Sequence, residues 1–569
     1  MQLLECVPNF SEGRDPVIIE KIAEAIRKVP EIRLLDIDPG KATNRTVMTF
    51  VGPPHAVEEA AFQAIATAAQ LIRMDEHTGE HPRMGATDVC PFIPISGMSM
   101  DEAVAVAKRV AQRVGENLEI PVFLYEKAAS ASYRANLADI RSGEYEGLEE
   151  KLKDQRWQPD FGPSSLHAGA GATVIGARNF LVAYNINLNT TSVRRANSVA
   201  FDVRERGRVK RTGNPITGEI EKDQNGEPVY IPGKLKSVKA IGWYIEEYGI
   251  AQISMNLTDI DITPVHVAFD AVCESAASRG LRVTGSELVG LIPKSALIEA
   301  GKYFLKKQQR SRGVDEKTLM HIAIKSLGLD ELKPFDPKKK VIEYLIEEEQ
   351  QAPLVQMSLD AFADLTASEA PAPGGGSIAA FAGTMGAALA TMVANLSAHK
   401  RGWDDRIDYF SDIAEQGQVL KTALLKQVDE DTAAFNRIMD AFQLPQGTPA
   451  EKTQRNEAIR TATLGAMQTP LHVMELAQKV VGLAGEMVRN GMKSSMSDAG
   501  VAVHCALTAL HGAHLNVRIN ARGMAEDPQA AEMLASAAEL ARATQVQANA
   551  ILQEVDAWLA PKETNASMG

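Results

Sequence analysis

The sequence predicts a multidomain protein in which two α/β subdomains, each a mixed sheet with helices, precede an all-α helical bundle. Its 569 residues exceed one hydrophobic core, because domains hold roughly 150 residues each. Short apolar runs alternate with helical patterns at first, whereas alanine dominates and no β-like run survives from Met357 onward. We therefore expect α/β subdomains at 1–177 and 178–345, a linker at 346–356 and a helical domain at 357–569.

In the first subdomain, short apolar runs predict strands at 3–8, 32–36, 45–51, 89–95 and 122–125. Helical patterns between them predict helices at 16–28, 55–72 and 100–116. Pro91 and Pro94 lack a backbone N–H and predict that the strand at 89–95 lies at an edge or an end of the sheet.

From residue 173 to residue 330, strands are predicted at 173–175, 180–186, 240–245 and 250–256, and helices at 264–279 and 294–303. The polar, turn-rich stretch between Arg211 and Tyr230 predicts an exposed hairpin or flap. Basic side chains gather between Arg194 and Lys239, which suggests an anionic ligand, although a solvated charged face is the commoner cause of such a run.

In the last domain, helices are predicted near 376–399, 406–442, 450–489, 498–515 and 528–558. The segment from Ser377 to Ala398 runs 22 residues without a charge. It is rich in Ala, Gly, Ser and Thr, which favours a buried, close-packed helix over a membrane span. We expect no membrane association.

The composition excludes several classes of protein. Apolar residues make up 45% and charged residues 23%, as in ordinary folded proteins, and the net charge of −13 argues against nucleic-acid binding. The four cysteines lie far apart without a C-x-x-C pair, which excludes a disulfide framework or a cysteine zinc site. With no signal peptide visible at the start, we expect a cytoplasmic protein.

One acidic residue interrupts the apolar stripe predicted for the helix at 406–442. Steps of three and four residues lead from Val428 through Asp431 to Phe435, so the Asp431 carboxylate is expected on the buried face. Burial would raise its pKa toward neutrality, which suits a group that takes and gives a proton. A core carboxylate that is hydrogen-bonded to a neighbouring helix is an equal alternative.

Two further features point to the same domain. The sequence PAPGGGS opens the charge-free helix, and its glycines Gly374, Gly375 and Gly376 would let a ligand approach the free N–H groups of the helix. A flexible entry with a serine cap explains them as well. Ser497 and Asp498 precede an apolar run and, taken alone, are most simply a helix cap.

In the first subdomain the densest polar stretch runs from His77 to Asp88. His77 and His81 are four residues apart, but Gly79 and Pro82 make a regular helix unlikely there and no third metal ligand is near. His81 therefore fits better as an acid/base, with Arg83 as a partner for a substrate carboxylate. A surface loop is the plain alternative.

Gly and Ser also crowd the segment between the two α/β subdomains, in DFGPSSLHAGAGAT from Asp160 to Thr173. Such a composition is expected where a flat ligand lies against backbone. A simple interdomain linker would explain it nearly as well.

These features coincide in one family. The chain resembles formimidoyltransferase–cyclodeaminases through LLECVPNFSEGRD, ATNRTVMTFVGPP, GEHPRMGATDVCPF, DFGPSS, NINL, IGWY, APGGGS and VDEDTAAF. The resemblance implies transfer of the formimidoyl group of N-formimidoyl-L-glutamate to N5 of tetrahydrofolate. It further implies cyclisation of the product to 5,10-methenyltetrahydrofolate with release of ammonia.

The resemblance also implies residue roles. His81 would be the transferase acid/base and Asp431 the proton shuttle of the cyclodeaminase, with Gly374, Gly375, Gly376, Ser497 and Asp498 as possible substrate contacts. The folate-binding residues would be Gly162, Pro163, Ser164, Ser165, Leu166, His167, Ala168, Gly169, Ala170, Gly171 and, beyond the flap, Gly233.

Tetrahydrofolate is expected as a co-substrate, polyglutamylated, and no metal is required. The family fold implies transferase sheets facing each other across a groove, and a homo-octamer built from dimers.

Three alternatives stay open. The donor could be N-formylglutamate, because no residue distinguishes C=O from C=NH in the substrate. The helical domain could be only an oligomerisation module, although a pure assembly bundle would more simply place Leu or Ala at 431. A metal hydrolase built on His77 and His81 would need bound zinc or iron.

Overall fold

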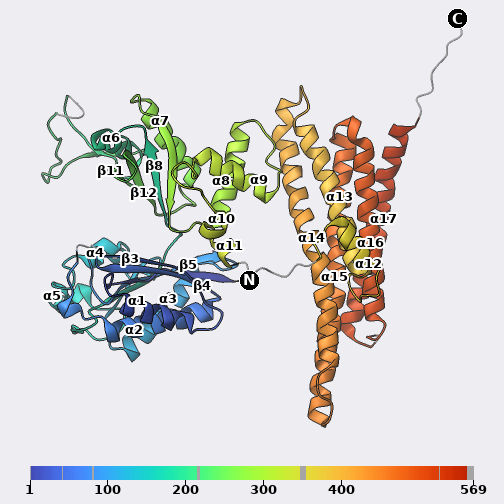
Figure 1. Ribbon diagram of the computed structural model, residues 1–569, viewed down its shortest axis with the longest axis horizontal. Coiled ribbons are helices and arrows are strands. Elements are labelled where there is room, and N and C mark those ends of the chain that lie inside the picture. Colours follow the sequence, from blue (N-terminus) through green and yellow to red (C-terminus); the bar gives the residue numbers. More distant parts are fainter. Residues whose placement is uncertain are drawn as a thin grey trace, which may run out of the picture. The chain divides into compact units, whose positions relative to one another are not determined.

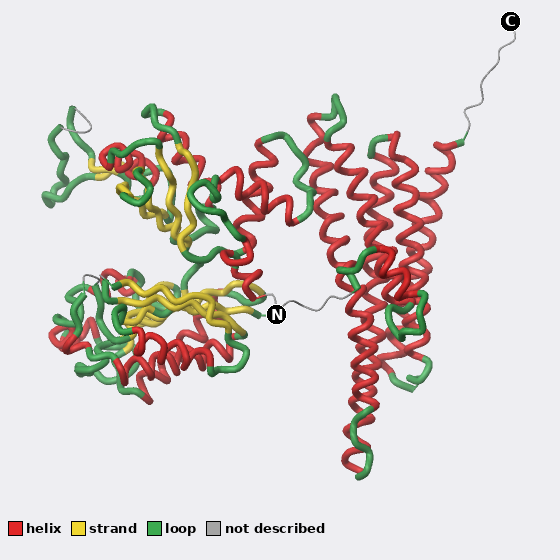
Figure 2. Tube along the Cα trace, viewed as in Figure 1, coloured by secondary structure: helices red, strands yellow, loops and turns green. Residues whose placement is uncertain are grey.

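The computed structural model describes residues 2–41, 43–79, 82–213, 218–346, 354–524 and 526–560. The chain forms two compact units: Met1–Leu297 with Leu327–Glu347, and Ile298–Ser326 with Glu348–Gly569. Among the described residues, all strands belong to the first unit and the second is helical (Figure 2). The predicted fold class, two α/β regions followed by a helical one, is confirmed. Most of the expected linker, residues 347–353, lies outside the described residues.

The strands described before residue 178 form a seven-stranded mixed sheet. Strands β1 (Leu3–Cys6) and β2 (Asn9–Phe10) both lie between β4 (Arg45–Gly52) and β5 (Thr87–Ser96), and β3 (Arg33–Gly40) pairs with β4. Beyond β5 come β7 (Thr173–Ala177) and β6 (Val122–Glu126), both parallel to their neighbours. The sheet therefore changes from antiparallel to parallel pairing at β5.

Three amphipathic helices cover one face of this sheet (Figure 1). They are α1 (Pro16–Arg27), α2 (Pro54–Leu71) and α3 (Met100–Asn117), and Ser99 with Glu102 forms a capping box at the start of α3. On the other face, the short helices α4 (Leu137–Arg141) and α5 (Leu148–Lys153) pack over Phe123 and Val174.

The prediction that residues 89–95 lie at a sheet edge or end is wrong, because β5 has strands on both sides. On one side its partner changes: β2 pairs with Thr87 and Val89, and β1 pairs with Phe92 and the residues after it. Pro91 lies in the gap between these two pairings. A proline is therefore tolerated in the middle of the sheet.

The second sheet is four-stranded and antiparallel throughout. Its order is β11 (Val238–Ile245), β12 (Ile250–Leu257), β8 (Val182–Leu188) and β13 (Val283–Val289), with α6 (Val193–Val203) and α7 (Val265–Ala277) packed against it. The expected flap is a two-stranded arm, β9 (Arg208–Val209) with β10 (Tyr230–Ile231), and residues 214–217 lie outside the described residues.

Most basic residues of this region have local partners. Arg208, Lys210, Lys234 and Lys236 form ion pairs with nearby carboxylates. The solvated-face interpretation therefore accounts for much of this basic segment.

The helical bundle matches the predicted segments closely. Its main helices are α13 (Gly375–Ala398), α14 (Ile407–Phe442), α15 (Pro449–Asn490), α16 (Met496–Ala521) and α17 (Pro528–Leu559), preceded by the short α12 (Leu359–Thr366). Thr448 and Asp527 cap α15 and α17, each directly before a proline at the first helical position. Helix α13 is long and apolar enough to cross a membrane, but 61% of its most apolar window is buried in the bundle.

Residues 298–326 differ from the sequence-based assignment, which placed them with the second α/β subdomain. This segment holds most of α8 (Lys294–Lys307) and all but the last residue of α9 (Glu316–Leu327), and it packs with the bundle. The reason is an ion-pair cluster: Arg312 binds Asp408, Asp412 and Glu415 of α14, and Lys302 also binds Glu415. Only local patterns are visible in a sequence, so this pairing over about 100 residues was not predictable.

The remaining described helices, α10 (Pro337–Lys340) and α11 (Ile342–Ile346), return to the first unit. Ile342 is fully buried in a small core with Leu3 and Val51. The chain therefore leaves the first unit after packing against its first sheet.

Candidate functional site

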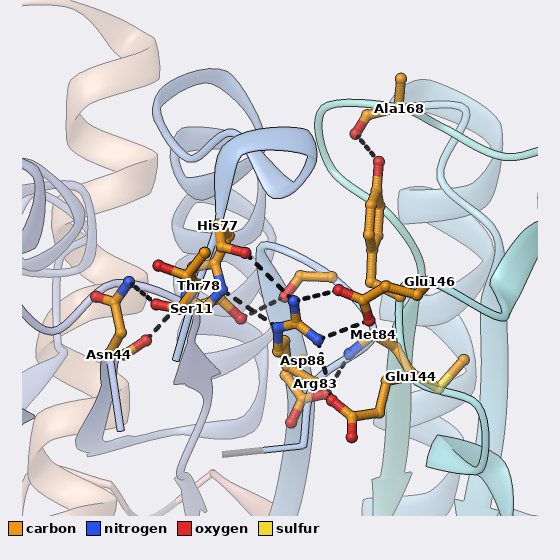
Figure 3. A network of polar contacts seen from close by, with 12 residues as sticks. Ser11, Asn44, His77, Thr78, Arg83, Met84, Asp88, Glu144, Glu146 and Ala168 are labelled. Atoms are coloured by element: carbon orange, nitrogen blue, oxygen red, sulfur yellow. Dashed lines mark hydrogen bonds and ion pairs between the residues drawn. The ribbon is translucent and has the colours of Figure 1, made fainter. Parts of the chain in front are cut away.

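The loop before β5 is held by a polar network (Figure 3). The guanidinium of Arg83 donates from Nε to His77 Nδ1 at 3.2 Å and from Nη2 to His77 O at 3.3 Å. It also donates to Glu144 at 2.9 Å and, from both terminal nitrogens, to Glu146 at 2.6 and 2.9 Å. All five N–H groups of this buried arginine are thus engaged.

Arg83 therefore has no donor left for a substrate carboxylate, and that predicted role is corrected. It holds the two ends of the loop together, since His77 precedes the loop and Arg83 follows it.

His77 is fixed as a neutral imidazole. Arg83 can only donate, so Nδ1 accepts and the proton lies on Nε2, which donates to Asn44 O at 3.1 Å. Burial lowers the pKa of His77, and the nearby Arg83 lowers it further, against the hydrogen bond to Asn44. Neither ring nitrogen is free for a metal.

No group of three potential metal ligands occurs among the described residues. His81 itself lies outside them, as does Glu80. The expectation that no metal is required stays a prediction.

Asn44 was missed by the sequence analysis, and it joins two of the quoted motifs to the residues directly before a third. Its side chain accepts from Gly13 N and donates to Thr78 O, both at 3.0 Å, while its carbonyl accepts from His77. Its φ of +48° is uncommon for a residue other than glycine, although asparagine tolerates it best. The only sequence signal was its place in ATNRT.

The stretch expected to bind folate lies against this loop. Ala86 N donates to Ala170 O, Ala172 N donates to Met84 O, and Met74 N donates to Gly169 O. Gly171 has a φ of +68°, and a Cβ there would lie 2.2 Å from Met84 O, so glycine is required. The backbone of 169–172 is therefore joined to the segments on both sides of His81.

Within the stretch, the residues divide into two groups. Leu166 packs on the apolar cluster with Phe123, and Ala170 and Gly171 are buried. The more accessible residues, which remain candidates for ligand contact, are Gly162, Pro163, Ser164, Ser165, His167, Ala168 and Gly169.

Gly233 lies elsewhere, in the second half of the unit. A Cβ there would lie 2.0 Å from Arg204 O, so this glycine is explained by close packing after α6. No hydrogen bond between described residues joins it to the 162–171 stretch.

In the helical unit, Asp431 lies directly against the N-terminus of α13. Its Oδ2 accepts from Ser377 N at 2.9 Å and lies 3.1 Å from Ser377 Oγ. A Cβ on Gly376 would lie 2.1 Å from Asp431 Oδ1, so the glycine makes room for the carboxylate. Burial raises the pKa of Asp431, and the two contacts with Ser377 oppose that rise.

Asp431 also marks the point where the stripe of α14 leaves the core. Val428 is 1% exposed, whereas Phe435 is 40% and Phe442 is 49% exposed. The expectation of a continuous buried stripe is therefore wrong beyond Asp431. The carboxylate is therefore half-buried, at the edge of the core.

The glycines of α13 have one polar neighbour that the sequence analysis missed. A Cβ on Gly375 would lie 3.4 Å from Asn516 Nδ2 of α16. Gly374 has open space at the same point. Asn516 sits inside an ordinary apolar helix pattern, so no local signal marked it.

Ser497 and Asp498 do not join this site. They lie in the first turn of α16, whereas Asn516 comes 18 residues later in the same helix. At 1.5 Å per residue the separation is roughly 27 Å. Within one chain they are therefore not substrate contacts beside Asp431, and Asp498 instead suits the positive end of the helix dipole.

Comparison with known proteins divides the chain into three consecutive parts. Family models match residues 3–178 ("Formiminotransferase domain, N-terminal subdomain"), 183–347 ("Formiminotransferase domain") and 358–539 ("Formiminotransferase-cyclodeaminase"). The formimidoyltransferase-cyclodeaminase of Rattus norvegicus is 42% identical over 527 residues, which cover 92% of this chain and 94% of that protein.

Two shorter relatives match one half each. The glutamate formimidoyltransferase of Streptococcus pyogenes serotype M1 is 39% identical over 304 residues, covering 53% of this chain and 93% of that protein. The methenyltetrahydrofolate cyclohydrolase of Methylorubrum extorquens is 37% identical over 177 residues, covering 31% of this chain and 85% of its own length.

Proposed function

Because the chain belongs to the formimidoyltransferase-cyclodeaminase family, we propose that each of its two units catalyses one of two consecutive reactions. The first unit transfers the formimidoyl group from N-formimidoyl-L-glutamate to N5 of tetrahydrofolate. The helical unit cyclises 5-formimidoyltetrahydrofolate to 5,10-methenyltetrahydrofolate and releases ammonia.

In the transfer, attack by N5 on the formimidoyl carbon forms a tetrahedral centre whose nitrogens exchange protons. We assign this exchange to His81, which can take the proton of N5 and give one to the departing glutamate nitrogen. The neutral His77 and the saturated Arg83 support this assignment indirectly, because both are occupied in holding the loop.

In the cyclisation, N10 attacks the same carbon and the amino nitrogen leaves as ammonia. Asp431 carries the proton from N10 to the leaving nitrogen. The contact that carries this proposal is the one with Ser377, whose hydroxyl lies 3.1 Å from Asp431 Oδ2 and 2.8 Å from Val428 O.

This contact satisfies both protonation states of Asp431. A hydroxyl has one proton and can also accept. When Asp431 is ionised, Ser377 Oγ can donate to it. When Asp431 is protonated, it can donate to Ser377 Oγ, which then donates to Val428 O. A pure assembly bundle has no need for such a group.

The folate is proposed to be polyglutamylated and to lie along the accessible part of 163–169. Exposed Arg194 and Arg195, in the first turn of α6, have no ion-pair partner among the described residues and would suit its tail carboxylates. A cytoplasmic location is supported by Cys6 and Cys90, whose buried sulfur atoms lie 3.4 Å apart as free thiols.

A homo-octamer built from dimers is also proposed. Helices α13 and α16 pack together, and each keeps a row of exposed apolar side chains. These are Met385, Met392 and Leu396 on α13, and Val501, Leu515 and Ile519 on α16. Such rows suit pairing with a second copy, and light scattering of the purified protein tests the subunit number.

The experiment that tests both activities is to mix the full-length protein with N-formimidoyl-L-glutamate and tetrahydrofolate. We expect near-UV absorbance of methenyltetrahydrofolate to grow together with free ammonia. Glutamate release without either product would support transfer alone. Absence of all three would contradict the proposed function.

A further inference from the structure

A small acidic pocket opens at the loop that carries the proposed transferase base. It has a volume of about 480 Å³ and is lined by His77, Thr78, Gly79, Arg83, Gly143, Glu144 and Glu146. With His77 neutral, its ionised side chains are two carboxylates and one guanidinium, which leave one negative charge in excess. A cation of matching size would neutralise the pocket.

The two carboxylates are not equivalent. Glu146 uses both oxygens to bind Arg83, at 2.6 and 2.9 Å. Glu144 uses only Oε2, at 2.9 Å, and its Oε1 accepts no hydrogen bond from any residue that the structure describes. Figure 3 shows Glu144 as the outer member of the network, with Arg83 between it and His77. Glu144 therefore holds the unused acceptor.

The backbone at Glu144 is unusual. Its φ is +53°, directly after Gly143 at +89°. A glutamate rarely adopts this left-handed conformation, and such conformations persist where the surrounding structure enforces them. Here Tyr145 N donates to Arg83 O and fixes the next residue.

The same loop reaches the segment proposed for folate. The hydroxyl of Tyr145 donates to Ala168 O at 2.7 Å, so the Tyr145 side chain joins the loop to that segment. On the opposite wall, Gly79 lines the pocket two residues before His81 in the sequence. The pocket is thus lined by the residues that lead to His81 in the sequence and by the loop that Tyr145 joins to the folate segment.

We propose that Glu144 is the residue that selects a formimidoyl donor over a formyl donor. This inference rests on the proposed transferase function and specifies its substrate. The formimidoyl group attached to nitrogen is an amidine, which is protonated at neutral pH, planar, and equipped with N–H donors. One of these donates to Glu144 Oε1 in a charge-assisted hydrogen bond.

A formyl group forms no hydrogen bond with the same carboxylate. It forms a neutral amide whose oxygen is an acceptor, and two acceptors facing each other leave the carboxylate unpaired. Holding the amidine as a cation also keeps its carbon electrophilic toward N5. The excess negative charge of the pocket is thus matched to one donor and not to the other.

The test uses full-length protein and both donors, N-formimidoyl-L-glutamate and N-formyl-L-glutamate, with tetrahydrofolate. Glu144→Gln should lower kcat/KM for the formimidoyl donor roughly 10- to 100-fold, mainly through KM, and leave the formyl donor within about threefold. The ratio of the two kcat/KM values should fall accordingly. Glu150→Gln, which removes an exposed carboxylate on α5 paired with Lys153, is the matched control and should leave the ratio unchanged.

A second readout uses small probes. Formamidinium chloride should inhibit the wild-type transfer competitively against the donor, and Glu144→Gln should weaken this inhibition about tenfold. Neutral formamide should inhibit both proteins equally poorly. Unchanged thermal unfolding of Glu144→Gln shows that the loop is intact.

The outcomes separate this inference from the proposed function. If the wild type transfers from neither donor, the proposed function fails. If the wild type transfers normally and Glu144→Gln keeps its donor ratio and its inhibition by formamidinium, the role of Glu144 is overturned. A wild type that does not distinguish the donors would overturn it as well.

Discussion

The carboxylate of Asp431 receives the backbone N–H of Ser377, the third residue of α13, at 2.9 Å. It thus takes the place of a capping side chain, which the N-cap residue Gly374 cannot supply. The helix N-terminus favours the ionised carboxylate, while burial favours the protonated one. A group balanced between these effects is suited to taking up and releasing a proton.

Asp431→Asn should abolish cyclisation and spare transfer. Asn keeps the size and an acceptor for Ser377 N but cannot exchange a proton. We expect ammonia release to fall on the order of 10²- to 10⁴-fold, with 5-formimidoyltetrahydrofolate accumulating and the melting temperature not lowered. Glu430→Gln, a neighbouring change whose side chain binds Arg437, is the control. Normal ammonia release by Asp431→Asn would show that the carboxylate is only a helix cap.

Ser377→Ala should change the pH dependence of cyclisation. The contacts from Ser377 lower the pKa of Asp431, so losing the hydroxyl should raise that pKa further. The acidic limb of the rate profile should move to higher pH, and kcat should fall about tenfold. Ser411→Ala is a matched control, because Ser411 is a fully buried serine of α14 whose hydroxyl has no partner among the described residues. An unshifted acidic limb would remove Ser377 from the mechanism.

His81→Ala should remove transfer while leaving cyclisation of supplied 5-formimidoyltetrahydrofolate within about twofold. The two groups belong to separately packed units, so their losses should be independent. Loss of a general acid/base costs on the order of 10²- to 10⁴-fold in rate. His55→Ala, which removes an exposed histidine of α2 paired with Glu31, should have no effect. Transfer at the wild-type rate would exclude His81.

Glu5→Gln should stabilise the protein, and more so at high pH. Burial raises the pKa of Glu5 to about 8, with Arg178 opposing and Glu343 adding to the rise. The folded state therefore holds a proton that the unfolded state releases, and wild-type stability falls as pH rises from about 4.5 toward 8. Gln carries no such penalty.

The gain of Glu5→Gln should thus be small at pH 5 and on the order of a few kcal/mol at pH 9. Denaturant unfolding at both pH values measures the difference, and Glu20→Gln on the exposed face of α1 is the reference. A gain independent of pH would mean that Glu5 stays ionised in the folded protein.

The sequence predicted the helices and the site residue that depend on local periodicity. The helix expected at 406–442 is Ile407–Phe442, and the one at 528–558 is Pro528–Leu559. Both were predicted closely because helix caps and apolar spacing can be recognised from residues that are near one another in the sequence. Asp431 was identified in the same way, as a break in a stripe. The partner Ser377 could be guessed only through the family motif, since it comes 54 residues earlier.

The features that were not predicted depend on contacts between residues that are far apart in the sequence. Asn44 reaches Thr78 across 34 residues, and Arg83 reaches Glu144 across 61. The sequence analysis assigned Arg83 to a substrate carboxylate because its actual partners, Glu144 and Glu146, are far from it in the sequence. Pro91 was placed at an edge because a strand whose partner changes midway has no local signature.

Residues 298–326 lie between two segments of the first unit in the sequence but pack with the second unit, which affects limited proteolysis. The chain passes from one unit to the other at 297/298, 326/327 and 347/348. A protease that nicks only the 347–353 stretch leaves two of these passages intact, and Arg312 still binds α14. The two fragments should therefore co-elute in size-exclusion chromatography in the absence of denaturant. A stop codon placed in that stretch would yield a transferase fragment that still carries residues 298–326 but lacks α14, the helix that Arg312 binds.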